Sequence, residues 1–279
     1  MSKSLDAAAI AQFDAEVKHE YQGMGKLRPT IRVRTGIVGS THRFPKMGKG
    51  IATKRIPQTD VVPMNIQHTN RTATLEDWNA PEFTDIFDQQ KTNVDERREL
   101  AVTIAGAITR REDQLVIDAL DASATTLTVG TNVGGTATGL NTDKVRRAKR
   151  LLDAKGVPAG NRTLIHSAIG LEQMLGLTDV TSSDFNTVKA LVDGDLNTWV
   201  GFKFMMIEDR TEGGLALAAG LRTNFGYHMQ STGLAIGIDF TTEVNYIPVK
   251  TSWLANGLFS AGAIDIDADG IVEITTTEP

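Results

Sequence analysis

Apolar residues at helical spacing predict a short helix near the start of the chain. Leu5, Ala9, Phe13 and Val17 recur at every fourth position. In an α-helix this spacing places the four side chains on one face. We therefore expect an N-terminal helix that docks through an apolar stripe.

A second and longer helix is predicted over about residues 94–121. Asn93 and Glu96 have the spacing of a capping box, and a long run without proline follows them. At 1.5 Å per residue, the helix would be about 40 Å long. Its expected buried stripe consists of Ala101, Ile104, Ile108, Leu115 and Ala119. Its expected charged outer surface consists of Arg97, Arg98, Arg110, Arg111, Glu112 and Asp113.

Residues 30–38 alternate apolar and basic side chains, the period of two that is typical of a strand. Glycines at 36, 39, 48 and 50 then interrupt the pattern, and residues 51–56 predict a weaker strand. Together they predict a long hairpin. A two-stranded ribbon has marginal stability alone, so the segment is either an arm that rests on a partner, which we favour, or a loose surface loop.

The rest of the chain mixes both kinds of element. A helix is expected from about Thr142 to Gly156, with Pro158 just beyond. Strands are predicted at 162–166 and 200–207, and short helices at 168–177 and 184–192. Residues 243–274 indicate a strand-rich end with a hairpin turned at 267–270. The predicted fold class is α+β.

Charge is distributed unevenly along the chain. Residues 21–59 hold nine Lys and Arg and no acid, so a net charge of -5 leaves -5 - 9 = -14 on the remainder. Such separation favours a basic segment that lies on an acidic surface, either a neighbouring copy or nucleic acid. The 279 residues include no cysteine, which excludes disulfides and thiolate chemistry and suits a reducing cytoplasm. No apolar run is long enough for a bilayer, and we expect no membrane partner.

The candidate motifs for chemistry are incomplete. The run Asp265-Ile-Asp267-Ala-Asp269-Gly270 copies the opening of an EF-hand loop, but position twelve is Thr276 and no flanking helix is expected, so we predict a turn. The five histidines are scattered, and neither Gly-Lys pair belongs to a phosphate loop. We predict no catalytic, cofactor or metal site, and no enzyme. The basic residues at 144–150 could contact nucleic acid, but a solvated helix face is favoured.

The order of these parts resembles the major capsid proteins of tailed bacteriophages, which have the Hong Kong 97 fold. The more specific pieces are the sequences at 46–50, 162–166, 201–204, 262–267 and 270–274. The resemblance implies an N-terminal arm (1–27), an extended β-hairpin called the E-loop (28–78), a peripheral domain with the spine helix (79–159), a mostly axial domain (160–240) and a strand-rich return to the peripheral domain (241–279).

The resemblance also implies partners. The hairpin would lie over a neighbouring subunit, and its expected interface residues are Arg32, Arg34, Arg43, Lys46, Lys49, Lys54 and Arg55. Spine-helix packing is expected from Ala101, Ile104, Ile108 and Leu115.

Copies would form hexamers and pentamers, with a separate scaffolding protein, a portal and packaged double-stranded DNA. The protein would be located in the virion and assemble in the host bacterial cytoplasm. Two other functions stay open: an encapsulin-like nanocompartment shell, and a soluble enzyme of unrelated fold. Some relatives crosslink a hairpin Lys to an Asn of another subunit; Asn256 is a conceivable acceptor, but we do not predict the bond.

Overall fold

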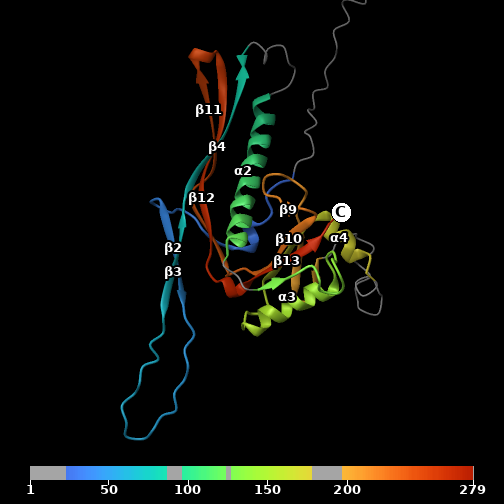
Figure 1. The fold of residues 1–279 in the computed structure, drawn as a ribbon. Coiled ribbons are helices and arrows are strands. Elements are labelled where there is room, and N and C mark those ends of the chain that lie inside the picture. The colour runs from blue at the N-terminus through green and yellow to red at the C-terminus, as the bar shows by residue number, and fades with distance from the viewer. Residues whose placement is uncertain (1–22, 87–95, 124–126, 178–196, 279) are drawn as a thin grey trace, which may run out of the picture.

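The computed structural model describes residues 23–86, 96–123, 127–177 and 197–278. Figure 1 shows a long sheet with a helix beside it, a hairpin that projects from the end of the sheet nearer the lobe, and a lobe that carries the C-terminus. The helices are α2 (Glu96–Asp121), α3 (Thr142–Ala154) and α4 (Ala168–Leu175), with 3-10 turns η2 (Arg28–Thr30), η4 (Pro248–Lys250) and η5 (Ala268–Gly270). No helix in the described part of the chain is long and apolar enough to cross a membrane.

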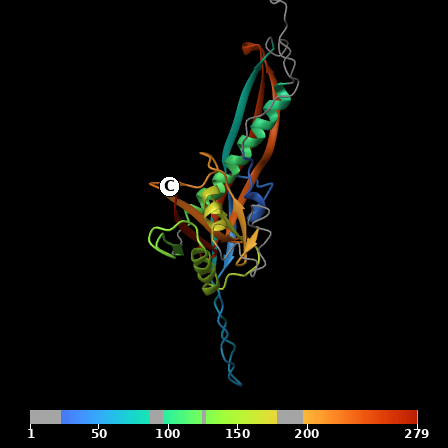
Figure 2. The same cartoon turned by 90° about the vertical axis from the view of Figure 1, so that its right-hand side faces the viewer.

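The long sheet has four strands in the order β1-β11-β12-β4. The strands are β1 (Arg32–Arg34), β11 (Thr232–Ile247), β12 (Ser252–Asp265) and β4 (Glu76–Asp85). Helix α2 lies along one face (Figures 1 and 2). The close approach requires Gly257 on β12, because a Cβ there would lie 2.4 Å from Cγ2 of Ile104. Ile104 and Ile108 are buried, and Ala101 and Leu115 are half-buried, so the predicted stripe is the packed face of the helix.

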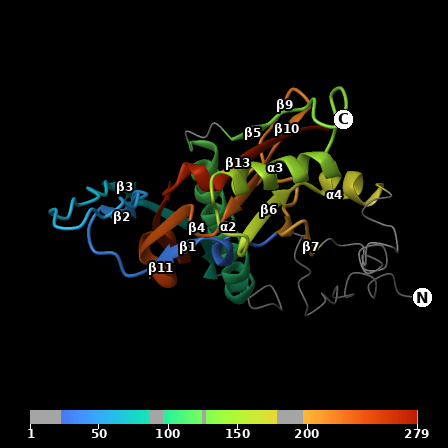
Figure 3. The same cartoon turned by 90° about the horizontal axis from the view of Figure 1, so that it is seen from below.

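The lobe contains a sheet of seven strands in the order β5-β13-β10-β6-β8-β7, with β9 paired to β10. The strands are β5 (Thr128–Val129), β6 (Arg162–His166), β7 (Thr198–Trp199), β8 (Phe202–Met206), β9 (Leu217–Ala218), β10 (Leu221–His228) and β13 (Ile271–Thr277). Neighbouring residues of β6 alternate between two cores. Ile165 packs with the last turns of α2, and Leu164 packs with α3 and α4. Figure 3 shows α3 and α4 along one side of this sheet.

The predicted hairpin exists, but its two strands are not the predicted ones. Its ribbon is formed by β2 (Thr41–Met47) and β3 (His68–Thr74), which are antiparallel. Residues 51–56 contain no strand and lie in the loop that joins them. The predicted strand at 30–38 shortens to β1, which pairs in parallel with β11 at Arg32↔Gly233. The alternating pattern does mark a strand, but that strand pairs with β11 in the subunit's own sheet and is not part of the hairpin ribbon.

Most other predicted elements are confirmed. The long helix, α3, β6, α4 and β8 match their predicted ranges closely. The stripe at 5–17, the cap residue Asn93 and the helix at 184–192 lie outside the described residues. The predicted C-terminal hairpin is wrong, because β12 belongs to the four-stranded sheet and β13 to the seven-stranded one. The turn between them therefore connects two sheets.

Candidate assembly surface

The outer half of the hairpin, residues 48–67, exposes apolar side chains to an unusual degree. Val61 is 89% exposed and Ile51 is 81% exposed. Ile56, Val62 and Met64 are exposed as well. Single exposed apolar residues are ordinary, but a contiguous group on a monomer marks a surface that another molecule covers. We call this segment the hairpin tip.

Basic side chains accompany these apolar ones. Lys54 and Arg55 are exposed, and among the described residues neither forms an ion pair. Lys49 reaches back to the body, where its Nζ donates to the carbonyl oxygen of Lys155 at 3.1 Å. The tip is thus apolar and cationic together, a combination that suits an acidic partner surface with apolar patches.

The base of the hairpin is fixed to the body by a small core of its own. Phe44 is fully buried with Ala73 against Ala235 and Ile266. The ring lies directly on Gly233, where a Cβ would come within 2.8 Å of it. Burying a phenylalanine side chain contributes about 1.5–3 kcal/mol, so this part of the ribbon is held firmly.

The acidic run at 265–270 also binds the hairpin base. Asp267 pairs with Lys46 at 2.7 Å, and Asp265 pairs with Arg71. Asp269 pairs with Lys155 at 2.8 Å, and this contact lowers the pKa of Asp269. The segment is a turn, as predicted, and its carboxylates have cationic partners. Within the described residues no group of three potential metal ligands occurs.

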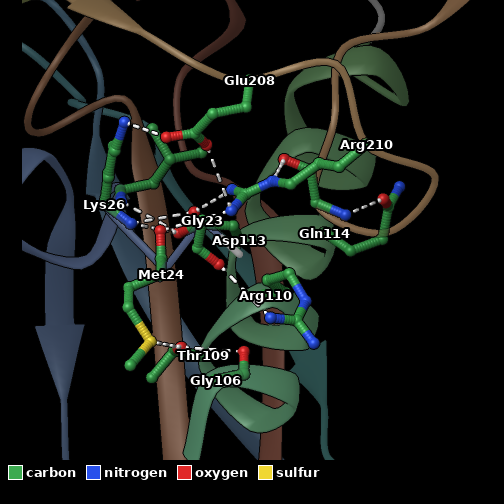
Figure 4. Close-up of polar contacts among 12 residues, drawn as sticks. Gly23, Met24, Lys26, Gly106, Thr109, Arg110, Asp113, Gln114, Glu208 and Arg210 are labelled. Atoms are coloured by element: carbon green, nitrogen blue, oxygen red, sulfur yellow. Dashed lines mark hydrogen bonds and ion pairs between the residues drawn. The ribbon is translucent and has the colours of Figure 1, made fainter. Parts of the chain in front are cut away.

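A buried polar cluster fixes the point where the N-terminal segment meets α2 (Figure 4). Asp113, 1% exposed, accepts hydrogen bonds from the backbone N–H groups of Lys26 at 2.8 Å and Leu27 at 2.9 Å. Nη2 of Arg210 donates to the same carboxylate at 2.7 Å, and Lys26 pairs with Glu208. Burial raises the pKa of Asp113, while these donors oppose the shift.

The prediction that Glu112 and Asp113 lie on the outer surface of the helix is therefore wrong. Glu112 is also buried, and burial raises its pKa to about 7 while Arg28 opposes the shift. The helix is covered on more than one side here, because the segment before β1 and the loop after β8 both pack on it. Arg111 is half-buried, with its guanidinium 3.5 Å from the ring centre of Trp78.

Lys144 is likewise buried, so the predicted solvated face of α3 is wrong at this position. Its Nζ donates to the carbonyl oxygens of Thr138 at 2.6 Å and Thr275 at 2.9 Å. Burial lowers its pKa to about 8. Arg146, Arg147 and Arg150 are exposed. Only part of the basic cluster on α3 is therefore exposed to solvent.

The predicted interface residues fall into separate groups. Arg32 and Arg34 belong to β1 of the long sheet, Arg43 and Lys46 to β2, and Lys49, Lys54 and Arg55 to the loop beyond it. Lys46 already forms an ion pair with Asp267 of the same subunit. Arg71 was not predicted as a functional residue, because it lies outside residues 21–59, the basic segment without acidic residues.

The face of the long sheet opposite α2 has two halves. Near the lobe, the β2–β3 ribbon covers it through Phe44 and Leu75. Farther out, antiparallel partners that share this face are Phe83 with Leu254, Pro81 with Asn256, and Asn79 with Leu258. Phe83 is 40% exposed. We call this outer half the open face.

The open face is acidic at its margins. Asp77 and Glu243 lie on it by register, opposite Ser260 and Asn256. Glu76 and Glu82 are also exposed on the edge strand β4, but they pair with Ala261 and Ala255 and therefore lie by register on the α2 side of the sheet. Asp77 and Glu243 flank a patch that includes Phe83, Leu254 and Leu258, so the open face carries acidic groups where the hairpin tip carries basic ones, and both surfaces expose apolar side chains.

Comparison with known proteins settles the family. A model of the family described as phage capsid protein matches residues 5–278. The chain belongs to the phage capsid protein family. No curated protein matches the sequence.

Solved phage capsids have the same fold, of the Hong Kong 97 type. The capsid structure of the cyanophage P-SCSP1u has a TM-score of 0.80 at 15% identity, over 100% of this chain and 96% of that one. The capsid of the Helicobacter pylori bacteriophage KHP30 gives 0.79 at 8% identity, over 99% and 98%. Mycobacterium phage Che8 gives 0.73 at 13% identity, over 95% and 96%. A capsid protein with this fold belongs to the virion and acts as a structural subunit.

Proposed function

We propose that this capsid protein is the major shell subunit of a tailed phage, which self-assembles as hexamers and pentamers into an icosahedral shell around double-stranded DNA. One observation carries the proposal. The hairpin is fixed firmly at its base and exposes an apolar, cationic tip, which is the form of an arm that binds a second molecule.

The partner surface that we propose for the tip is the open face of a neighbouring copy. Complementary charge supports this, since Lys54 and Arg55 would meet Asp77 and Glu243. The apolar residues of the tip would cover Phe83 and its neighbours on the sheet. Continuity supports it too, because the subunit's own hairpin base already packs on the other half of that face.

The remaining partners follow from the proposed role. A scaffolding protein, a portal and the packaged genome would join the shell, and assembly would take place in the bacterial cytoplasm. The four-stranded sheet with α2 would be the peripheral domain, and the seven-stranded lobe would include the axial domain. We propose a structural role without a catalytic step.

Charge reversal on both surfaces tests the proposal. Lys54→Glu with Arg55→Glu should block closed particles, and so should Asp77→Lys with Glu243→Lys, because each pair creates like-charge contacts. All four substitutions in one chain should restore assembly, scored by sedimentation and negative-stain microscopy. Asp143→Lys, an exposed change on α3, serves as the control.

Normal assembly of either two-site variant, or no rescue by the four-site variant, would refute the proposed contact. Particles that contain protein cargo in place of DNA would indicate an encapsulin-like compartment instead.

A further inference from the structure

The hairpin has two different kinds of attachment to the body. The first is apolar: Phe44 and Ala73 are buried on Gly233 and Ala235. This contact lies at one point along the ribbon, close to the sheet. Leu75, which follows β3, packs in the same cluster, so these contacts fix where the ribbon begins but lie too close to its base to fix its angle.

The second attachment is ionic and reaches both strands of the ribbon. Lys46 on β2 pairs with Asp267 at 2.7 Å. Arg71 on β3, directly opposite Phe44, pairs with Asp265 and also donates through Nε to the Asp265 carbonyl oxygen at 3.1 Å. Lys49, farther out, donates to the carbonyl oxygen of Lys155. The restraints are therefore distributed along the ribbon.

The turn that supplies the carboxylates is itself held rigidly. The N–H groups of Ile266 and Asp267 both donate to the carbonyl oxygen of Ser231, at 2.7 and 3.1 Å. Asp267 also accepts from the N–H of Asp269 at 3.1 Å, which closes the turn. Since this turn joins β12 of one sheet to β13 of the other, it lies where the two sheets meet.

The two attachments differ in their dependence on salt. The side chains of Lys46 and Asp267 are 36% and 40% exposed. A cavity of about 260 Å³ adjoins the turn and is lined by Lys49, Lys155 and both Asp267 and Asp269. Salt should therefore weaken the exposed Lys46–Asp267 pair. The Arg71–Asp265 pair has a buried carboxylate, and the apolar contact at Phe44 does not depend on charge.

We propose that Asp265 and Asp267 are positioning residues that set the direction of the hairpin, with Phe44 as its pivot. When the two ion pairs are lost, the ribbon stays attached at Phe44 but no longer holds one angle. The inference concerns a single subunit. Only its consequence, that the tip is presented to a neighbour at a fixed angle, rests on the proposed function.

The chain has no cysteine, so introduced cysteines provide clean labelling sites. Gln67→Cys, just beyond the ion pairs, and Arg150→Cys on α3 are both exposed positions. Spin labels there report the hairpin direction in the full-length, unassembled subunit as a distance distribution. We expect one narrow peak in the parent and a broader, shifted distribution in Asp265→Asn with Asp267→Asn. Asp143→Asn removes the same kind of charge elsewhere and should change nothing.

Two further variants keep the test decisive. Lys46→Gln with Arg71→Gln removes the same ion pairs from the hairpin side. This variant still tests the proposal if circular dichroism shows that the aspartate variant does not fold. Lys46→Asp with Asp267→Lys restores one ion pair with its charges exchanged, so its distance distribution should be narrower than that of the glutamine variant. A distribution in the glutamine variant that matches the parent would overturn the proposal, whether or not shells form.

Discussion

The seven-stranded lobe and the hairpin tip both contain basic and apolar residues, but these are buried in the lobe and exposed in the tip. In the lobe, Arg222 is buried and bonded to Glu278 at 2.8 Å and Asp209 at 2.6 Å. In the tip, Lys54 and Arg55 are exposed and have no ion-pair partner among the described residues. Charges in the lobe therefore contribute to the fold of one subunit, whereas charges in the tip are available to another molecule.

Apolar residues show the same contrast. Ile165 and Leu164 on β6 face two separate cores and are both fully buried. Val61 and Ile51 in the tip are almost fully exposed. Exposed apolar area costs free energy in water, so the tip is stabilised only when a partner covers it. The lobe stabilises the subunit, and the tip stabilises the assembly.

The largest loss of stability is expected from a charge in the packed face of α2. Ile108→Asp would place a carboxylate in the core at a cost on the order of several kcal/mol. Val102→Asp changes an exposed residue of the same helix and should cost little. Denaturant unfolding of the purified subunits measures both. Similar unfolding midpoints would mean that the contrast between buried and exposed positions on α2 is misassigned.

A smaller loss is expected at the polar cluster near the N-terminal segment. Asp113→Ala removes the acceptor for two backbone N–H groups and leaves Arg210 with Glu208, at 3.5 Å, as its remaining ion-pair partner. Breaking a buried pair in this way costs about 3–5 kcal/mol. Asp143→Ala removes an exposed carboxylate and should change the free energy of unfolding by less than about 1 kcal/mol. Equal effects would show that the cluster is not a stabilising element.

A pH-dependent effect is expected from Glu112. Its pKa is raised from 4.5 to about 7, so the folded state binds more protons than the unfolded state between those values. The resulting stabilisation is complete below pH 4.5 and is lost as the pH rises through 7. In the parent, this effect should lower the free energy of unfolding by about 2–3 kcal/mol between pH 5 and 8. Glu112→Gln should remove this dependence, which is measured as a flatter profile of the thermal midpoint against pH. A parallel pH profile in parent and variant would contradict this.

The smallest effect on the subunit is expected in the tip. Val61→Ser with Val62→Ser should change the free energy of unfolding by less than about 0.5 kcal/mol, because both side chains are exposed. Assembly should nevertheless require a higher protein concentration, since less apolar area is buried against the neighbour. Light scattering across a concentration series measures the shift. An unchanged critical concentration would argue against an apolar contact at the tip.

Local signals predicted the parts of the fold that depend on local sequence. The run without proline and the apolar stripe predicted α2, which ends at Asp121 as expected, and Gly156 with Pro158 predicted the end of α3. The strand at 162–166 was predicted with its observed bounds. These elements carry their own periodicity and end signals.

The failures share a physical cause, which is pairing between distant segments. Arg32 lies opposite Gly233, and no local pattern reveals that partner. The acidic run at 265–270 was found as a motif, but its bonding partners Lys46 and Arg71 lie 221 and 194 residues away. Glu112 and Asp113 were predicted to be exposed because helical periodicity describes one face only. The loops that cover them come from elsewhere in the chain.

The most direct test of the account removes the tip itself. Replacement of residues 51–64 by a two-residue Asn-Gly turn should keep the β2–β3 ribbon and the ion pairs at its base, because these lie outside the deleted loop. Thermal unfolding and sedimentation velocity would be measured on the same preparation. The account predicts an unchanged thermal midpoint together with complete loss of closed particles. Normal particles from the shortened chain, or a subunit that no longer folds, would contradict it.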